Sequence, residues 1–192
     1  MDARFCVVVL AALIGPGLFT GPAFAVQDRN KAIDQYLEEF CSPDLRNIPK
    51  FDTAIKDVLR RIPKDAFLIV MDRRRPVIFT EIFDSGTARF AGSSEFIVLP
   101  QDKPCCSEGF TILKLSMGLG QAKDPAAIEG IIAHELAHRV LDHIRRGHVS
   151  CQAEREANAL IKQWGFGKEF KEASKTFGQR KGDPAGCQEK TS

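Results

Sequence analysis

The chain has 192 residues, 44% of them hydrophobic, which is enough for one compact domain with a substantial core. Its net charge of +2 comes from interspersed acidic and basic residues, so no basic stripe indicates binding to nucleic acid. No internal repeat is visible. The composition therefore indicates a single globular domain.

The N-terminus has the composition of a cleaved secretion signal. Arg4, offset by Asp2, precedes an apolar run over residues 5–14, and "GPG" then interrupts the run. The segment ends in "AFA", with small residues at the positions that a signal peptidase reads, so we expect cleavage after Ala25. A retained membrane anchor is the alternative, but the run is about half of the ~20 residues that span a bilayer. We therefore expect residues 1–25 to be removed and the mature protein to be secreted or periplasmic, with no stable membrane span.

Helical periodicity dominates the segment after the signal. Apolar residues recur at helical spacing over residues 28–40 and again over residues 52–62, which predicts two helices. The pattern then changes to short runs rich in β-branched and aromatic residues, separated by turn-forming stretches. These runs predict a small, mostly antiparallel sheet with strands at residues 66–72, 75–83, 88–100 and 109–117.

The second half of the chain returns to helical patterns. Three helices are predicted, at residues 125–146, 152–164 and 168–177. Asp124 as N-cap, Pro125 at the first helical position and Gly147 beyond the end delimit the first of them. The element order predicts an α+β domain over residues 26–178, followed by a polar tail at residues 179–192.

The first of these three helices carries the motif "HELAH", which has the form H-E-x-x-H. At about 100° per residue, His134 and His138 lie about 40° apart on one face, so both imidazoles can reach one ion. Glu135 lies beside that face, where it can accept a proton from an activated water. Apolar residues surround the helix, and burying two imidazoles among them costs several kcal/mol unless a partner satisfies them. The pattern therefore predicts a zinc site.

A catalytic zinc needs a third protein ligand and an open position for water. His143 is five residues beyond His138, about 140° further round the helix, which argues against it as a ligand. His148 is a weaker possibility in the following loop. Glu154 lies on the apolar face of the helix at residues 152–164, whereas Glu156 lies on its polar face.

Glu154 is therefore the predicted third ligand. The alternative for Glu154 is an internal salt bridge with an arginine such as Arg139. Asn158 lies one turn further on the same face, where it could support a ligand through a hydrogen bond.

The stretch "HELAHRVLDH" followed by "EREANALIKQWGF" resembles the gluzincin zinc peptidases, and in particular the family of the CAAX prenyl endopeptidase and the periplasmic chaperone-proteases. The resemblance covers roughly residues 109–166. It implies a zincin-like fold, with the sheet packed on the H-E-x-x-H helix and on a second ligand-bearing helix. Its motif residues imply three zinc ligands: His134, His138 and Glu154. Glu135 corresponds to the catalytic base, and His143 matches an extra histidine of that family that is not a ligand.

Two features leave the subfamily open. Asn158 stands where that family has Asp, and the gap between the two motifs is short. Both features also resemble the metallopeptidase domains of regulators that cleave phage repressors, which carry E-x-x-A-N and are intracellular. The zinc-peptidase interpretation is common to both families.

We therefore expect an exported zinc peptidase that hydrolyses a peptide or protein substrate, with Glu135 as the general base. The oxyanion of the reaction needs a second donor, and His143, His148 and Arg145 are the candidates. The strand at residues 109–117 is expected to receive the substrate as an added strand. The alternative function is a secreted binding or chaperone module in which zinc only links two helices. An intact Glu135 favours the enzyme, since a structural site has no use for it.

Export also makes the cysteines of the mature chain candidates for disulfides. Their number is odd, so at least one is free or pairs with another chain, and no C-x-x-C spacing indicates a zinc ribbon. In a zincin arrangement we expect Cys151 to bond with Cys105 or Cys106, and Cys187 with Cys41. The alternative is a free Cys151 thiol that approaches the zinc.

Overall fold

The structure, a computed structural model, describes residues 22–82, 92–97, 106–145 and 150–177. These segments form an α+β fold with seven α-helices, one short 3₁₀ helix and a three-stranded sheet. The elements, in chain order, are α1 (Pro22–Phe40), α2 (Pro43–Asn47), α3 (Pro49–Arg61), α4 (Lys64–Val70), β1 (Val77–Ile82), β2 (Gly92–Ile97), β3 (Phe110–Ser116), η1 (Met117–Gln121), α5 (Ala126–Val140), α6 (Cys151–Gln163) and α7 (Gly167–Phe177).

The two predicted terminal segments lie largely outside the described residues. Of the predicted signal peptide, only residues 22–25 are described, and the predicted cleavage site after Ala25 falls in the first turn of α1. The predicted tail at residues 179–192 is not among the described residues. None of the helices in the described part of the chain is long and apolar enough to cross a membrane.

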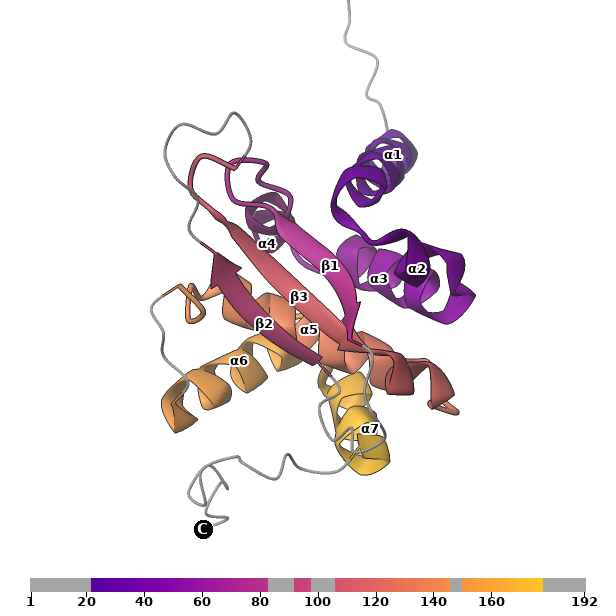
Figure 1. Cartoon of the computed structure of the whole chain (residues 1–192), viewed down its shortest axis with the longest axis vertical. Coiled ribbons are helices and arrows are strands. Elements are labelled where there is room, and N and C mark those ends of the chain that lie inside the picture. The colour runs from indigo at the N-terminus through magenta and orange to yellow at the C-terminus, as the bar shows by residue number, and fades with distance from the viewer. Residues whose placement is uncertain (1–21, 83–91, 98–105, 146–149, 178–192) are drawn as a thin grey trace, which may run out of the picture.

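The sheet has the strand order β1-β3-β2, with β3 in the centre (Figure 1). β1 pairs with β3 in parallel and β2 pairs with β3 in antiparallel, so the sheet is mixed rather than mostly antiparallel as predicted. The prediction that residues 109–117 receive a substrate strand is wrong, because β3 already uses both of its edges for β1 and β2. In the described residues, β1 and β2 are the edge strands; the outer side of β1 meets Cys41 through an isolated bridge to Phe79, and no described strand pairs with the outer side of β2.

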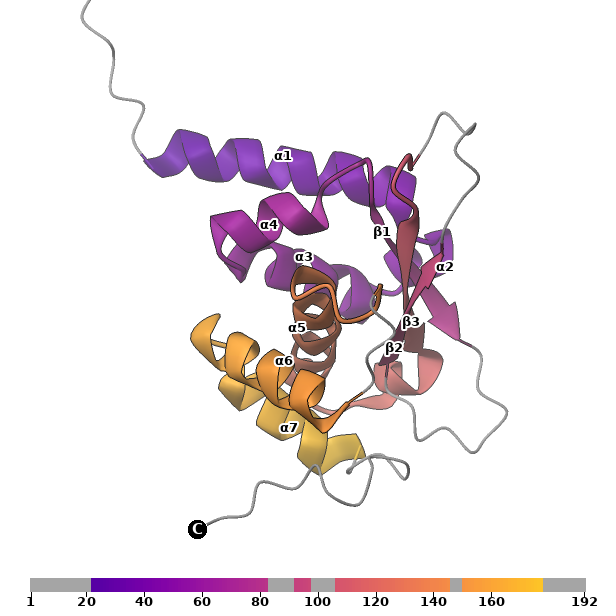
Figure 2. The ribbon, with the colours of Figure 1, turned by 90° about the vertical axis from the view of Figure 1, so that its left-hand side faces the viewer.

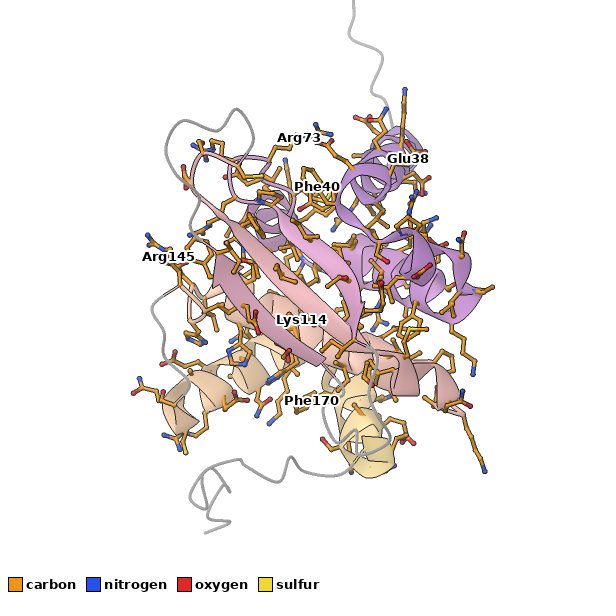
Figure 3. The ribbon with its side chains drawn as sticks, in the orientation of Figure 1. Glu38, Phe40, Arg73, Lys114, Arg145 and Phe170 are labelled. Carbon is orange, nitrogen blue, oxygen red and sulfur yellow. The ribbon has the colours of Figure 1, made fainter. Side chains whose placement is uncertain are left out.

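One face of the sheet packs against helices. Thr111, Leu113 and Leu115 of β3 are buried and alternate with half-exposed residues, as expected for a sheet with a single covered face. Figure 2 shows the sheet close to edge-on, with α3, α4 and α5 on one side of it. On the other face, Lys114 of β3 forms an ion pair with Glu95 of β2 at 2.6 Å (Figure 3).

Helix α5 is the centre of the fold. It contacts α3, α4, α6, α7 and β2, and consequently buries residues on all sides. Its closest neighbour is α7: a Cβ atom placed on Gly130 would lie 2.5 Å from the carbonyl carbon of Glu169. A helix that is buried on all sides belongs in the core of a domain, and α5 is such a helix although Glu135 and Arg139 are among its buried residues.

The predicted strand at residues 66–72 is wrong, since the structure forms helix α4 there. Pro63 stands immediately before this helix, and Asp65 lies in its first turn, where a carboxylate complements the helix dipole. Ala66 and Val70 are one helical turn apart and both buried, whereas Leu68 between them is 57% exposed. Short apolar runs of this kind suit either a strand or a buried helix, and here tertiary packing decides.

The remaining helices confirm the predictions with shifted ends. The helix predicted at residues 52–62 corresponds to α3, and that at residues 168–177 corresponds to α7. The short helix α2 was not predicted, although its N-cap is legible in the sequence: the Oγ atom of Ser42 accepts hydrogen bonds from two backbone N–H groups in its first turn.

Candidate metal centre

Three of the predicted site residues come together between α5 and α6. His134 and His138 of α5 and Glu154 of α6 each offer a ligand atom, and these atoms lie within 4.8 Å of one another. The two Nε2 atoms are 3.1 Å apart. The carboxylate of Glu154 places Oε2 3.2 Å from Nε2 of His134 and Oε1 3.4 Å from Nε2 of His138. The structure therefore confirms that these three side chains converge.

The phase of α6 explains why Glu154 takes part. Ser150 caps this helix, with its Oγ atom accepting a hydrogen bond from the backbone N–H of Ala153 at 3.1 Å. Ala153, Ala157 and Ile161 form the buried face, and Glu154 lies at its margin with a side chain that is 24% exposed. Glu154 therefore faces α5 as the helical wheel predicted.

The donor set fits a divalent metal such as zinc. When both Nε2 atoms are unprotonated and Glu154 is ionised, three lone pairs point at one another, and a cation relieves their repulsion. Burial acts to raise the pKa of Glu154, but hydrogen bonds from His134 and His138 and their positive charge outweigh it. When these histidines carry a proton on Nε2, the net effect is a pKa well below the ordinary range for a glutamate.

The ring of His134 is also held by an aromatic side chain. Phe170 of α7 stacks on it with ring centroids 4.8 Å apart and an angle of 13° between the planes. Figure 3 shows Phe170 on α7, and α7 in turn packs on α5. The far nitrogen of this histidine, Nδ1, is buried and has no hydrogen-bond partner in the described part of the chain.

The predicted base, Glu135, lies beside the open edge of the sheet. Its side chain is buried, with the residue only 4% exposed. The hydroxyl of Ser94 in β2 donates a hydrogen bond of 2.5 Å to Oε2 of Glu135. The carboxylate next to the ligand pair is thus tied to the edge strand.

The helix that carries the histidines ends earlier than predicted. It stops at Val140 rather than near residue 146, because Asp142 takes a left-handed conformation with φ of 60°. The backbone N–H of Asp142 then donates to the carbonyl of Arg139 at 3.2 Å, and the N–H of His143 donates to the carbonyl of His138 at 3.0 Å. This pair of bonds is a Schellman motif, which folds the residue after the turn back onto the last full turn of the helix.

His143 consequently lies against His138. Their Nδ1 atoms are 3.1 Å apart, and the rings meet edge to face with centroids 5.3 Å apart. Nε2 of His143 is 2.9 Å from Oε2 of Glu156 on α6. Both nitrogens of His143 are thus engaged, which does not favour the predicted role as oxyanion donor. Of the other two candidates, Arg145 is exposed and paired with Asp142, and residue 148 lies outside the described ranges.

Two further predictions concern the surroundings of Glu154. The alternative ion pair with Arg139 is not formed: that guanidinium is buried and donates to the backbone carbonyls of Ile69 and Arg75. Burial lowers the pKa of Arg139 to about 10. Asn158 follows Glu154 by one turn, and its Oδ1 is buried without a hydrogen-bond partner among the described residues. Its support of a ligand stays a prediction.

The cysteines follow the expected pattern in part. Cys106 and Cys151 are both disulfide-bonded, and Cys151 is the first residue of α6. A disulfide at this position anchors the start of the helix that carries Glu154. Cys41, in contrast, is a buried free thiol, so the predicted bond between Cys41 and Cys187 is wrong.

Two residues of the site escaped the sequence analysis. Ser94 lies 41 positions before Glu135 and meets it only through the sheet. Glu156 lies on the exposed side of α6, as predicted, and nothing in the sequence pattern indicates that it reaches His143. Comparison of the chain with protein-family models, with curated proteins and with solved structures finds no match.

Proposed function

We propose that the protein is a zinc-dependent peptidase in which His134, His138 and Glu154 hold the metal and Glu135 is the general base. The observation that carries this proposal is the convergence of the three ligand atoms within 4.8 Å, next to a buried glutamate that the metal binding does not use. Zinc bound there would lower the pKa of a water molecule to about 7 and polarise a substrate carbonyl.

Glu135 supplies the proton transfer. Its carboxylate accepts the proton of the attacking water and passes it to the leaving amine. The hydrogen bond from Ser94 holds one carboxylate oxygen beside β2, which limits the positions that the base can adopt. A glutamate placed this way has no purpose in a site that only links two helices, and this supports an enzyme over a zinc-stabilised binding module.

The outer edge of β2, which no other described strand covers, supports a peptide or protein as substrate. An extended peptide can add to an open sheet edge by backbone hydrogen bonds, and this edge is the one that carries the contact to Glu135. The side chains of a peptide in that position alternate between the α5 side and the outer face. A peptide bound along β2 would therefore place its scissile bond near Glu135, because Ser94 of β2 holds the carboxylate of Glu135.

The finer assignments belong to the same proposal. The resemblance of "HELAHRVLDH" and "EREANALIKQWGF" to the gluzincins supports a zincin-like arrangement of sheet and ligand helices. The apolar N-terminal segment with its "AFA" site supports export and cleavage after Ala25. Disulfides at Cys106 and Cys151 are in keeping with an oxidising compartment.

The proposal is tested with Glu135→Gln and with Glu172→Gln, a carboxylate-to-amide control on α7 whose ion pair among the described residues is with Lys175. Metal content is measured by elemental analysis and hydrolysis with a panel of unstructured peptides. We expect all three proteins to hold one zinc, and we expect hydrolysis to fall by about 10²–10⁴-fold in Glu135→Gln alone. Wild-type protein that holds zinc but cleaves nothing would indicate the binding module, and equal rates in Glu135→Gln would refute the proposed base.

A further inference from the structure

The two nitrogens of the His138 ring face different partners. Nε2 points to His134 and Glu154, within 3.4 Å of both, and belongs to the ligand cluster. Nδ1 points to His143 at 3.1 Å. The ring is therefore held from both sides, and the second side is not part of the metal centre.

A contact between His143 and Glu156 connects the His138 ring with the protein surface. His143 is only 7% exposed and places its Nε2 2.9 Å from Oε2 of Glu156, whose side chain is 46% exposed. The other carboxylate oxygen of Glu156 accepts a hydrogen bond of 2.8 Å from the side-chain amide of Gln152. A continuous series of hydrogen bonds thus connects a buried ligand with an exposed carboxylate.

When His138 binds a metal through Nε2, only one arrangement of protons gives each hydrogen bond between His138, His143 and Glu156 one donor and one acceptor. Its Nδ1 must then carry the proton and donate it to Nδ1 of His143, which accepts. The proton of His143 must stand on Nε2, where it is donated to the acceptor-only carboxylate of Glu156. The negative charge at the outer end thus selects the tautomer that His138 needs at the inner end.

We propose that His143 and Glu156 are positioning residues that fix the orientation and tautomer of His138, so that metal affinity depends on a carboxylate at the protein surface. This inference rests on the proposed metal centre. It also changes the expectation from the sequence, in which the exposed position of Glu156 gave it no part in metal binding. Hydrogen-bond partners of metal-bound histidines typically contribute about 10–100-fold to metal affinity.

The experiment measures zinc affinity of the full mature chain by competition with a chelator. We expect Glu156→Gln to weaken zinc binding by about 10–100-fold, because the amide no longer selects the proton position on His143. Glu172→Gln removes the same charge from a half-exposed site on α7 and should change the affinity less than about twofold. Glu156 is half exposed and Gln keeps its shape, so the variant is expected to fold as the wild type does.

A double-mutant cycle with His143→Phe separates positioning from simple charge attraction. If Glu156 acts through His143, Glu156→Gln has no further effect on affinity once His143→Phe is present. If it acts through space, the two losses multiply, and this outcome would overturn the proposal. Equal zinc affinities of Glu156→Gln and Glu172→Gln would overturn it as well.

A second measurement needs neither metal nor activity. Long-range proton–nitrogen NMR correlations of the metal-free chain report which ring nitrogen of His143 carries the proton. We expect Nε2 to be protonated in the wild type. A spectrum with the proton on Nδ1 alone would refute the proposed positioning role of His143 and Glu156. The two proposals can fail separately. If Glu156→Gln and Glu172→Gln show the expected zinc affinities but the wild type hydrolyses no peptide, the peptidase is refuted and the positioning role of His143 and Glu156 is supported.

Discussion

Substitution of Gly130 by alanine sets two opposing effects against each other. The residue lies within α5, one turn before His134, where alanine is a better helix former than glycine by about 1 kcal/mol. Helix propensity alone therefore predicts a more stable protein. The structure predicts the opposite, because a Cβ atom at this position would lie 2.5 Å from both the carbonyl carbon and the oxygen of Glu169 and 2.6 Å from the nitrogen of Phe170.

These neighbours are backbone atoms, so no side-chain rotation relieves the overlap. Helix α7 must retreat by about 0.9 Å for the contact to lengthen from 2.5 Å to the ordinary 3.4 Å. A gap of about 0.5–1 Å already removes a quarter to a half of the dispersion attraction between facing atoms. Overpacking costs about 1–3 kcal/mol, and we expect a clash with backbone atoms to fall in the upper part of that range, at about 2–3 kcal/mol. We therefore expect a net loss of about 1–2 kcal/mol after the gain in helix propensity, and a melting temperature lower by about 2–8 °C.

Thermal and denaturant unfolding of Gly130→Ala measure this loss, with Gly120→Ala as the matched control. A Cβ atom on Gly120 would lie 3.5 Å from the ring of Phe51, an ordinary contact, so the control should stay within about 0.5 kcal/mol of the wild type. Zinc affinity should fall together with stability in Gly130→Ala, since α7 carries the ring that stacks on His134. A variant as stable as the wild type, or more stable, would refute the reasoning from close helix packing.

Four further outcomes are expected. Glu154→Ala should abolish zinc binding measured by elemental analysis, because it removes one of three ligands, and retention of a full equivalent of zinc would contradict the ligand set. Tyr36→Phe should lower the free energy of unfolding by about 1–3 kcal/mol in a denaturant titration. The buried hydroxyl of Tyr36 donates to one backbone carbonyl at 2.9 Å and accepts from one backbone N–H at 2.7 Å, so an unchanged midpoint would argue against these bonds. Asp142→Val should cost about 1–2 kcal/mol more than Asp142→Gly in the same assay, because both variants lose the ion pairs with Arg75 and Arg145 but only valine opposes the φ of 60°. Equal losses would exclude the left-handed turn as the cause. Cys41 should resist alkylation at pH 8 until the chain is unfolded, since burial raises the pKa of its thiol to about 12; labelling of the native protein would show that the thiol is accessible.

The convergence of His134, His138 and Glu154 could be predicted from sequence because the position of each side chain follows from a local rule. The four-residue spacing of His134 and His138 and the phase of Glu154 on its helix both follow from helix geometry. Their convergence needs only that α5 and α6 pack with their apolar faces together, and Ala157 in that interface is fully buried. The same rules also separated Glu154 from the exposed Glu156.

Helix α4, the end of α5 and the contact between His138 and His143 could not be predicted, because they depend on contacts that sequence spacing does not encode. The apolar run at α4 satisfies the pattern of a strand, and the burial of Ala66 and Val70 in the assembled core decides for a helix. The predicted helix of His138 is longer than α5, because a left-handed aspartate has no strong signal in a single sequence. The angle of about 140° between His138 and His143 was calculated for a continuous helix. It therefore excluded the ligand role but could not show the contact between the two rings.

The separation of the site residues along the chain has a consequence for the order in which the protein matures. His134 and Glu154 are 20 residues apart on two successive helices, whereas Ser94 meets Glu135 across 41 residues and only after β2 has paired with β3. A contact across 41 residues closes a longer loop than a contact across 20 residues, so we expect Ser94 to meet Glu135 later than the two helices dock. During refolding in the presence of zinc, we expect the helical pair to capture the ion before the edge strand is in place. Metal uptake should then precede the appearance of hydrolysis. During that interval the chain would hold the ion before Ser94 has positioned Glu135 and before β2 can bind a peptide.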